Sequence, residues 1–358
     1  MGAKRVVIKI GTGVLTKGVG KLNTARMSAI CKQVADLRNR GCEVALVSSG
    51  AVGLGMGRLE LKERPKRISA VQKCAAVGQG ILIDTWSRLF AKHGIVIAQL
   101  LLTKDDVDIH NRHKALGELF NELLNENIVP VINENDSVSA SELNIKFGDN
   151  DVLSALVSSL IKADELVILS TASGLLNLSG DGKKIKRVEF IDSKIRGMAS
   201  GTTSATAVGG MITKIRAAEI ATNSGCGTYI ANGSEPNVLG KILDGENPGT
   251  YFVPSKKSVS SKKRWIAYFG HTCGKLYADE GAVGAIRKRG SSLLLAGVKS
   301  IEGNFHAGDL IEVFSTDTKE IVARGLAYMD SEKMKPLVGK KSDDKKAFAI
   351  HRDNLAIR

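Results

Sequence analysis

Four clusters of small, polar and charged residues stand at points where an apolar stretch of the chain ends or a helical stretch begins. The first is VVIKIGTGVL, residues Val6–Leu15, in which Lys9 is followed by Gly11, Thr12 and Gly13. Glycines let backbone N–H groups approach a phosphate closely, and a lysine adds a point charge there. The stretch matches neither GxxxxGK(S/T) nor GxGxxG. By itself it fits both a phosphate-binding loop and a plain turn after a strand.

The second cluster is ALVSSGAVGLG, residues Ala45–Gly55, where Ser48, Ser49, Gly50 and Ala51 follow another apolar run. Serine hydroxyls and free backbone amides at the end of a strand can bind an anionic ligand. A helix beginning there would add a partial positive charge. An ordinary turn between a strand and a helix is the alternative interpretation.

The third cluster is the densest and lies in two neighbouring segments, VPVINENDSV and FGDNDVLSALVSSLI. Its polar members are Asn133, Glu134, Asn135, Asp136, Asp149, Asn150 and Asp151. Asparagine both donates and accepts hydrogen bonds, as an α-amino acid ligand requires, and Asp136 could pair with an ammonium group. Asp149 could instead cap a helix. The set is larger than capping needs, so we favour a binding function here.

The fourth cluster is AVGGMITKIRAAEIA, residues Ala207–Ala221, where two glycines precede a predicted helix with Lys214 in its first turn. A basic residue at a helix N-terminus opposes the helix dipole, which a bound phosphate would justify; otherwise Lys214 is simply solvated. Together the two lysines, Lys9 and Lys214, the glycine loops and the carboxylates are typical of phosphoryl transfer, which needs positioning and charge neutralisation. No Ser/His/Asp triad, HExxH motif or cysteine cluster is evident, so we predict no metal-ligating residues from such motifs.

Short β-branched stretches alternate with longer amphipathic stretches over about the first 250 residues. We predict strands at Arg5–Ile10, Glu43–Ser48, Val96–Leu101, Val129–Ile132, Glu165–Leu169 and Gly227–Ala231. We predict helices at Asn23–Arg40, Arg67–His93, Ile109–Glu126, Asp149–Ile161 and Gly210–Ser224. This alternation, with unbroken apolar strands, indicates an α/β fold with a mostly parallel sheet covered on both faces. Such sheets bind ligands at the C-terminal ends of their strands.

The pattern changes where the basic stretch SKKSVSSKKR interrupts the alternation. Short strands with turns follow, and Leu310–Phe314 and Ile321–Ala327 are predicted to form a hairpin. We therefore predict a first domain over residues 1–253, a linker over 254–270 and a small, mostly β domain over 271–358.

The formal net charge is +14, and 20 basic against 12 acidic residues fall between Ser255 and Arg358. A basic tail domain suggests a polyanion such as RNA as partner; solubility alone is the other explanation, and both stay open. No apolar run approaches the roughly 18 residues of a membrane span. The first residues pass directly into a predicted strand without a signal-peptide pattern. We expect a cytoplasmic protein with no membrane partner.

Five motifs in this order and spacing, KIGTGVL, SSGAV, INENDSV, GDND and GGMITK, resemble the glutamate 5-kinases of the amino acid kinase superfamily. The stretch DEGAVGAIRKRGSSLLLAGVKSIEGNFHAGDLIEV resembles the PUA domain appended to bacterial members. The resemblance runs nearly the whole length of the chain. It implies an αβα sandwich with a mostly parallel central sheet plus a PUA-like domain. The implied reaction is transfer of the ATP γ-phosphate to the γ-carboxylate of L-glutamate, with Mg²⁺, as the first step of proline biosynthesis.

The resemblance also implies roles for individual residues. In the catalytic group Lys9 would contact the transferring phosphoryl group, Lys214 would neutralise charge on the ATP side, and Asp149 and Asp151 would orient the lysines and help to keep Mg²⁺ in place. Glutamate would be bound by Ser49, Gly50, Ala51, Asn133, Asp136 and Asn150. Nucleotide would be bound by Lys9, Gly11, Thr12, Gly13, Ser170, Thr171, Val208, Gly209, Gly210, Met211, Ile212, Thr213 and Lys214.

Further implications concern partners: inhibition by proline, a downstream glutamyl phosphate reductase, and a homodimer or homotetramer. The sequence departs from the family at ILSTASGLLN, where Thr171 and Ala172 stand in place of a usual Asp-containing pair, which removes a carboxylate from the nucleotide side. Two other functions stay open, another amino acid kinase and an RNA-binding scaffold with a degenerate kinase fold. Aromatic residues make up only 4% of the chain, so stacking platforms for RNA bases would be scarce.

Overall fold

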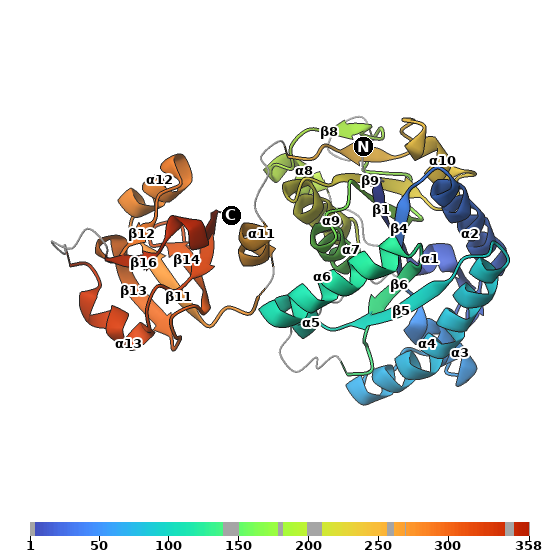
Figure 1. The fold of residues 1–358 in the computed structure, drawn as a ribbon, viewed down its shortest axis with the longest axis horizontal. Helices are drawn as coiled ribbons and strands as arrows, with labels where there is room; N and C mark the ends of the chain where they lie inside the picture. The colour runs from blue at the N-terminus through green and yellow to red at the C-terminus, as the bar shows by residue number, and fades with distance from the viewer. Residues whose placement is uncertain are drawn as a thin grey trace. The chain divides into compact units, whose positions relative to one another are not determined.

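The computed structural model describes residues 4–138, 150–177, 182–198, 210–255, 261–268, 270–340 and 347–357. The chain divides into two compact units. The first comprises Met1–Asp106 and His113–Ser258, and the second comprises Val107–Arg112 and Val259–Arg358 (Figure 1).

The first unit is built on an eight-stranded sheet in the order β5-β6-β4-β1-β7-β9-β10-β8. Its strands are β5 (Ile97–Leu102), β6 (Val129–Glu134), β4 (Glu43–Ser48), β1 (Arg5–Ile10), β7 (Glu165–Ser170), β9 (Gly227–Asn232), β10 (Thr250–Phe252) and β8 (Arg187–Val188). The first six pair in parallel, and β10 runs antiparallel to β9. Because parallel strands are covered on both faces, these strands are nearly continuous apolar runs.

Helices cover both faces of this sheet (Figure 1). The longer helices are α2 (Thr24–Asn39), α4 (Ile68–Ala91), α6 (His110–Asn125), α7 (Asn150–Leu160) and α9 (Met211–Asn223). The shorter ones are α1 (Thr12–Leu15), α3 (Ala51–Arg58), α5 (Lys104–Asp108), α8 (Ser193–Met198) and α10 (Val238–Leu243). One core joins α2, α4 and α10 to alternate residues of β1, such as Ile8 and Ile10, while α7 and α9 pack together and α7 contacts β1 and β7.

These elements confirm the predicted mostly parallel αβα sandwich. Each predicted strand and helix of the first part of the chain is present, with ends shifted by at most two residues. Asn23, predicted as the first residue of a helix, is its N-cap, and its side chain accepts a hydrogen bond from the Arg26 backbone N–H at 3.2 Å. The prediction did not include the short helices α1, α3, α5, α8 and α10, the small hairpin β2 (Thr16–Gly18)–β3 (Lys21–Leu22), or the short strands β8 and β10.

Helices α3 and α4 touch backbone to backbone. A Cβ added to Gly55 would lie 1.8 Å from the Cys74 carbonyl oxygen, and one added to Gly78 would lie 1.8 Å from that of Ala51. Neither position has room for any side chain, so glycine is required at this crossing. The close approach holds α4 directly beside the start of α3, which follows β4.

The second unit has a five-stranded sheet in the order β13-β11-β14-β15-β17 and a two-stranded sheet of β12 and β16. The strands are β11 (Gly274–Ala278), β12 (Leu293–Leu294), β13 (Val298–Gly303), β14 (Leu310–Ser315), β15 (Ile321–Leu326), β16 (Phe348–Ile350) and β17 (Leu355–Ile357). The helices are α11 (Ser261–Tyr268), α12 (Glu280–Arg289) and α13 (Ser331–Met334). The predicted hairpin is confirmed as the antiparallel pair β14–β15.

Helix α11 lies within the predicted linker. Its Ile266 and Ala267 are buried against Leu310 and Ala356 of the second unit. The guanidinium of Arg324 on β15 donates to the Ala267 carbonyl oxygen at 3.3 Å and to that of Gly270 at 2.8 Å. The segment is therefore partly folded onto the sheet of the second unit.

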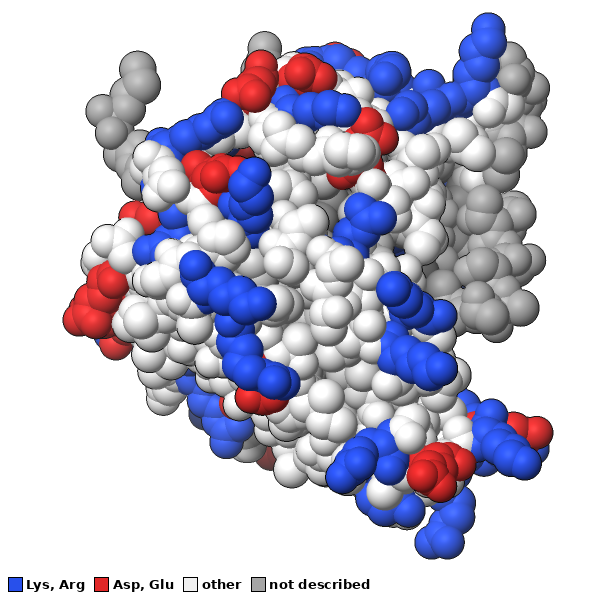
Figure 2. Space-filling model, turned by 90° about the vertical axis from the view of Figure 1, so that its right-hand side faces the viewer, with Lys and Arg blue, Asp and Glu red and all other residues white. Residues whose placement is uncertain are grey.

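The positive charge is not gathered into one patch on the face drawn in Figure 2. Lys and Arg side chains are spread apart there, and Asp and Glu side chains lie among them. That face therefore does not by itself indicate a polyanion site. Within the described ranges, no helix combines the length and the apolar character needed to cross a bilayer.

Candidate active site

The four sequence clusters meet at one edge of the first unit's sheet. Lys9 lies near the C-terminal end of β1, Asn133 near that of β6, and Ser170 at the end of β7, while Ser49 directly follows β4. These strands are neighbours and parallel, so their C-terminal ends share an edge. The helices α3, α7 and α9 begin at the same clusters.

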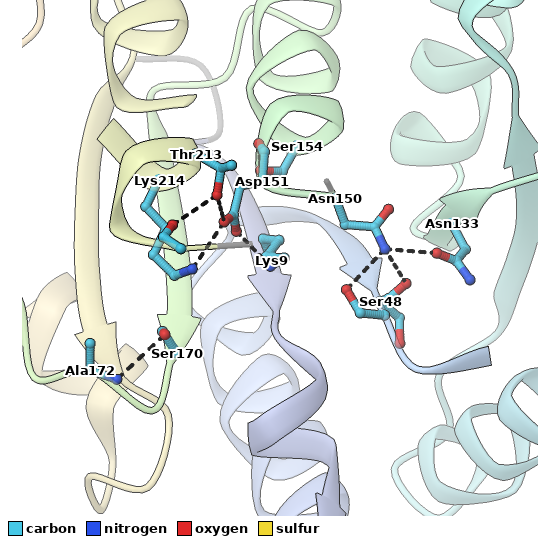
Figure 3. A network of polar contacts seen from close by, with 12 residues as sticks. Lys9, Ser48, Asn133, Asn150, Asp151, Ser154, Ser170, Ala172, Thr213 and Lys214 are labelled. Atoms are coloured by element: carbon cyan, nitrogen blue, oxygen red, sulfur yellow. Dashed lines mark hydrogen bonds and ion pairs between the residues drawn. The ribbon is translucent and has the colours of Figure 1, made fainter. Parts of the chain in front are cut away.

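Asp151, in the first turn of α7, is the centre of the charged part of the site (Figure 3). Its Oδ1 lies 2.5 Å from the Nζ of Lys9, and its Oδ2 lies 3.1 Å from the Nζ of Lys214. The hydroxyl of Thr213 donates to Oδ2 at 3.0 Å. The three charged residues are almost inaccessible to solvent, with 0% exposure for Asp151, 4% for Lys9 and 6% for Lys214. The alternative of a solvated Lys214 is therefore wrong.

Among the described residues, the Asp151 carboxylate contacts both buried ammonium groups. Burial, the largest single influence, would raise the pKa of Asp151, but Lys9 and Lys214 together outweigh it and hold that pKa below its ordinary value. The carboxylate is therefore ionised at neutral pH. Two ammonium groups held in place in a site with little solvent can neutralise an anion at small cost in reorganisation, so the cluster is suited to a phosphoryl group.

The glycine loop after β1 lies against this cluster. A Cβ added to Gly11 would lie 3.8 Å from the Lys9 Nζ, so the ammonium group folds back beside the loop. The Gly11 N–H donates to the Leu169 carbonyl oxygen of β7 at 3.0 Å. A Cβ on Gly13 would lie 2.9 Å from the Thr171 Cγ2. The loops after β1 and β7, both predicted to bind nucleotide, are thus in contact.

A chain of amide hydrogen bonds occupies the other side of the site. Asn150 Nδ2 lies 2.9 Å from both the Ser49 Oγ and the Asn133 Oδ1, and 3.4 Å from the Ser48 carbonyl oxygen. Asn133 Nδ2 in turn donates to the Gln79 Oε1 at 2.8 Å. Figure 3 shows Asn150 directed toward Ser48 and Asn133, and Asp151 directed toward the lysines. Two adjacent residues of α7 therefore serve the two halves of the site.

Two residues of α4 that were not predicted from the sequence also lie in this region. Gln79 is one, and Trp86, whose Nε1 donates to the Ser48 Oγ at 2.9 Å, is the other. Gln79 stands among small and apolar residues in CAAVGQGIL, and a lone amide in such a stretch is the signal that could have found it. Trp86 gives no such signal, because a tryptophan in an amphipathic helix is usually only a core residue.

Gly50 forms the turn between β4 and α3 with φ = 107°, a left-handed conformation that side chains disfavour. Its added Cβ would lie 3.9 Å from the Thr12 Cγ2. The turn after β4 therefore adjoins the glycine loop after β1. Helix α3 begins at Ala51, so its N-terminus faces this junction, where an anion would be favoured.

We expect Gly50→Ala to lower the free energy of unfolding by about 1–2 kcal/mol and to weaken binding of the acceptor substrate, because a Cβ opposes the backbone angle of this turn. Thermal unfolding and substrate KM measure the two effects. The matched control is Gly53→Ala in α3, where an added Cβ meets nothing within 4 Å. The control should be neutral or stabilising; equal losses in both variants would contradict the argument.

Asp136 lies half-buried in the turn after β6. Burial raises the pKa of its carboxyl above the ordinary value, and the positive charge of Arg64 partly opposes that shift. Arg64 is exposed and belongs to the connection between α3 and α4. A partly desolvated carboxylate three residues after Asn133 in the chain is suited to an ammonium group.

The remaining predicted residues fall at two places. Gly210 is the N-cap of α9, and Met211, Ile212, Thr213 and Lys214 form its first turn. Ser170 ends β7, where its Oγ accepts from the Ala172 N–H at 3.4 Å, and Thr171 is exposed beside it. Asp149, Val208 and Gly209 lie outside the described residues. Within the described part of the chain, no three His, Cys, Asp or Glu side chains are grouped to hold a metal ion.

Comparison with known proteins agrees with these two units. Residues 4–232 match the amino acid kinase family, and residues 274–348 match the PUA domain. Glutamate 5-kinase from Thermoanaerobacter sp. (strain X514) is 44% identical over 365 residues, covering 99% of this chain and 97% of its own. Glutamate 5-kinase from Neisseria meningitidis serogroup A is 40% identical over 355 residues, covering 98% and 95%.

Solved structures extend the likeness in fold. Carbamate kinase from Giardia lamblia bound to AMP-PNP superposes with a TM-score of 0.50 at 18% identity, covering 71% of this chain and 99% of its own. A second structure of Giardia carbamate kinase gives a TM-score of 0.51, also at 18% identity, with coverage of 71% and 100%. At this identity the likeness concerns the fold alone.

Proposed function

Because this chain belongs to the amino acid kinase family and, within it, to the glutamate 5-kinases, we propose that it transfers the γ-phosphoryl group of ATP to the γ-carboxylate of L-glutamate. The product is γ-glutamyl 5-phosphate, and the reaction is the first step of proline biosynthesis. The observation that best supports this chemistry is the buried pair of lysines that both contact the Asp151 carboxylate.

The reaction needs charge neutralisation more than proton transfer. A carboxylate is ionised at pH 7 and is already a nucleophile, so no general base is required. The barrier comes from bringing two anions together, and preorganised cations in a dry site lower it. We assign Lys9 to the phosphoryl group in transfer and Lys214 to the ATP side. Asp151 keeps the two ammonium groups in place.

ATP is proposed to lie along the loops after β1 and β7 and at the start of α9. Its contacts would come from Lys9, Gly11, Thr12, Gly13, Ser170, Thr171, Val208, Gly209, Gly210, Met211, Ile212, Thr213 and Lys214. Contact between the first two loops, through Gly13 and Thr171, supports a continuous surface for the phosphates. Thr171 is exposed and uncharged, so this position places no carboxylate near the phosphates, in contrast to the Asp-containing pair that is usual in the family.

Mg²⁺ fits this site as a companion of ATP. Both oxygens of Asp151 are engaged by lysines and Thr213, and Mg²⁺ characteristically takes most of its ligands from phosphates and water. Asp151, with Asp149 beside it in sequence, would hold the metal's outer ligands. When bound, the ion neutralises charge on the β- and γ-phosphates.

Glutamate is proposed to occupy the amide side of the site. Ser49, Gly50 and Ala51 offer a hydroxyl and the N-terminus of α3 to a carboxylate, while Asn133 and Asn150 offer amides. Asp136 would pair with the α-ammonium group. Contact between the turn at Gly50 and the loop at Thr12 supports placing the γ-carboxylate next to the transferred phosphoryl group.

Hydroxylamine trapping tests this function. Purified protein with Mg·ATP and hydroxylamine is compared in the presence of L-glutamate, of L-aspartate and without acceptor, and both ADP and hydroxamate are measured. We expect a hydroxamate that depends on glutamate, because hydroxylamine traps an acyl phosphate. ADP release without hydroxamate, or hydroxamate only with aspartate, would refute the proposed substrate.

We expect Asp136→Asn to raise the glutamate KM by about tenfold or more at pH 8, because the ammonium group loses its counter-charge. In the wild type the glutamate KM should also rise as pH falls toward the pKa of Asp136, which burial places above its ordinary value. Below that pKa the carboxyl is neutral, so the two enzymes should converge. If the glutamate KM of both the wild type and the variant were independent of pH in this range, the role assigned to Asp136 would be wrong.

The wider setting of the enzyme is also proposed. An acyl phosphate is labile in water, so a glutamyl phosphate reductase should consume the product. We further propose inhibition by proline at the glutamate site, assembly as a homodimer or homotetramer, and action in the cytoplasm.

A further inference from the structure

Helix α4 reaches the glutamate side of the proposed site through two polar contacts. Gln79 and Trp86 are seven residues apart and therefore lie on one face of the helix, two turns from each other. Gln79 accepts from Asn133 on β6, and Trp86 donates to Ser48 at the end of β4. The backbone contact between α3 and α4 at Gly55 and Gly78 fixes this face relative to the site.

The direction of each hydrogen bond follows from the chemistry of the partners. The Ser48 backbone oxygen can only accept, so the nitrogen of the Asn150 amide must face it. Asn133 must then present its oxygen to that nitrogen, which leaves its own NH₂ group for the Gln79 Oε1. Gln79 is the acceptor that ends this chain, and a donor at position 79 would turn the Asn133 NH₂ toward the Asn150 NH₂, against the orientation that the Ser48 oxygen requires.

The orientation of the Asn150 amide satisfies its nitrogen but leaves its oxygen without a hydrogen-bond partner among the described residues. Its nitrogen lies within 2.9–3.4 Å of three acceptors, whereas its buried Oδ1 has no hydrogen-bond partner among the described residues. An unsatisfied buried carbonyl oxygen costs free energy, and such costs are concentrated at functional sites. The amide nitrogen is thus kept toward Ser49 as a donor, and a substrate carboxylate can take the place of the Ser49 Oγ as acceptor of that N–H.

We propose that Gln79 is a positioning residue that, through Asn133, holds the Asn150 amide as a hydrogen-bond donor to the acceptor substrate. This inference rests on the proposed function for the identity of that substrate. Gln79 does not touch the reacting atoms. It acts by requiring a donor from Asn133, which makes Asn133 an acceptor toward Asn150.

Reversing the end of the chain and then restoring it tests the proposal. In Gln79→Lys the ammonium group can only donate, so Asn133 must turn its oxygen toward position 79 and its NH₂ toward the Asn150 NH₂. We expect the glutamate KM to rise by about tenfold or more, with the ATP KM changed less than about twofold. Adding Asn133→Asp supplies a carboxylate that accepts from both neighbours. The glutamate KM of the double variant should therefore fall below that of Gln79→Lys and lie within about threefold of the glutamate KM of Asn133→Asp alone.

Three results would overturn the proposal: a glutamate KM unchanged in Gln79→Lys, parallel changes in the glutamate and ATP KM values, or no recovery in the double variant. If Gln79→Lys does not fold, Gln79→Met decides, because it removes the acceptor at similar volume. It should raise the glutamate KM several-fold without altering the ATP KM, and unchanged or parallel KM values would again overturn the proposal. Hydroxamate formation by the wild type is the reference. Its absence would refute the glutamate kinase function, whereas its presence together with failed rescue refutes only the role of Gln79.

Discussion

Replacing Lys9 by Met should lower kcat by about 10³-fold, because the transferring phosphoryl group loses a preorganised cation in a site that excludes water. Lys9 is 4% exposed and lies 2.5 Å from Asp151, so water cannot readily take the place of its ammonium group. The variant should nevertheless fold. Asp151 keeps its contacts with Lys214 and Thr213, so its buried carboxylate still has a cationic partner. Hydroxamate formation and thermal unfolding measure the two effects.

Lys4→Met is the matched control for this variant. Lys4 immediately precedes β1, is 39% exposed at its side chain and pairs with Glu165 at 3.5 Å, at the end of the strand remote from the site. Its removal should change kcat by less than about twofold, because this pair lies at the strand end remote from the site and touches no residue assigned to it. If Lys9→Met kept a tenth of the wild-type kcat, or lost it only together with its thermal transition, the assigned role of Lys9 would be wrong.

The strands that carry the site could be predicted from the sequence because each is an unbroken apolar run that stops at a polar cluster. The run before Lys9 and Gly11 and the run before Asn133 each specify a buried strand and its C-terminal end without reference to the rest of the chain. Because the connections are helical, the strands are parallel, and their ends must meet. This is why residues from separate clusters could be assigned to one site.

The burial of Lys214 could not be predicted in the same way. Its neighbours in MITKIR are compatible with a solvated first helical turn, and its partner Asp151 is 63 positions away. The role of Gln79 was missed for the same reason, since its partner Asn133 is 54 positions away. Local pattern specifies which residues end an element, but charge pairing and amide orientation depend on tertiary contacts that periodicity does not encode.

Short elements were missed for a different reason. Strands β8 and β10 span two and three residues, too few for an alternating pattern to be recognised. Helix α11 begins with the charged residues of SKKR, which favoured a linker, although its Ile266 and Ala267 are buried. The hydrophobic half of that segment is recognisable only once the sheet that covers it is known.

Replacing Asp151 by Asn should destabilise the protein and inactivate it together. Two buried ammonium groups would then face an amide in place of a carboxylate, and breaking a buried ion pair costs about 3–5 kcal/mol. We also expect kcat to fall by about 10²-fold or more, since neither lysine would be held in position. Asp84→Asn, which breaks the exposed pair with Arg88, should change the free energy of unfolding by less than about 1 kcal/mol. Urea unfolding and the hydroxamate assay measure these changes.

The pH dependence of the same variant separates charge pairing from packing. The lysines hold the pKa of Asp151 below its ordinary value in the folded protein, so its contribution to stability is fully present above the unfolded pKa of about 4 and is lost as pH falls through the folded pKa. The difference in unfolding free energy between wild type and Asp151→Asn should therefore stay constant from pH 8 to about pH 5 and narrow below about pH 4. A difference that shrinks between pH 8 and pH 6 would show that another group titrates with the pair. A difference unchanged at the lowest pH at which both proteins still fold would show that shape and hydrogen bonding, not charge, hold Lys9 and Lys214 in place.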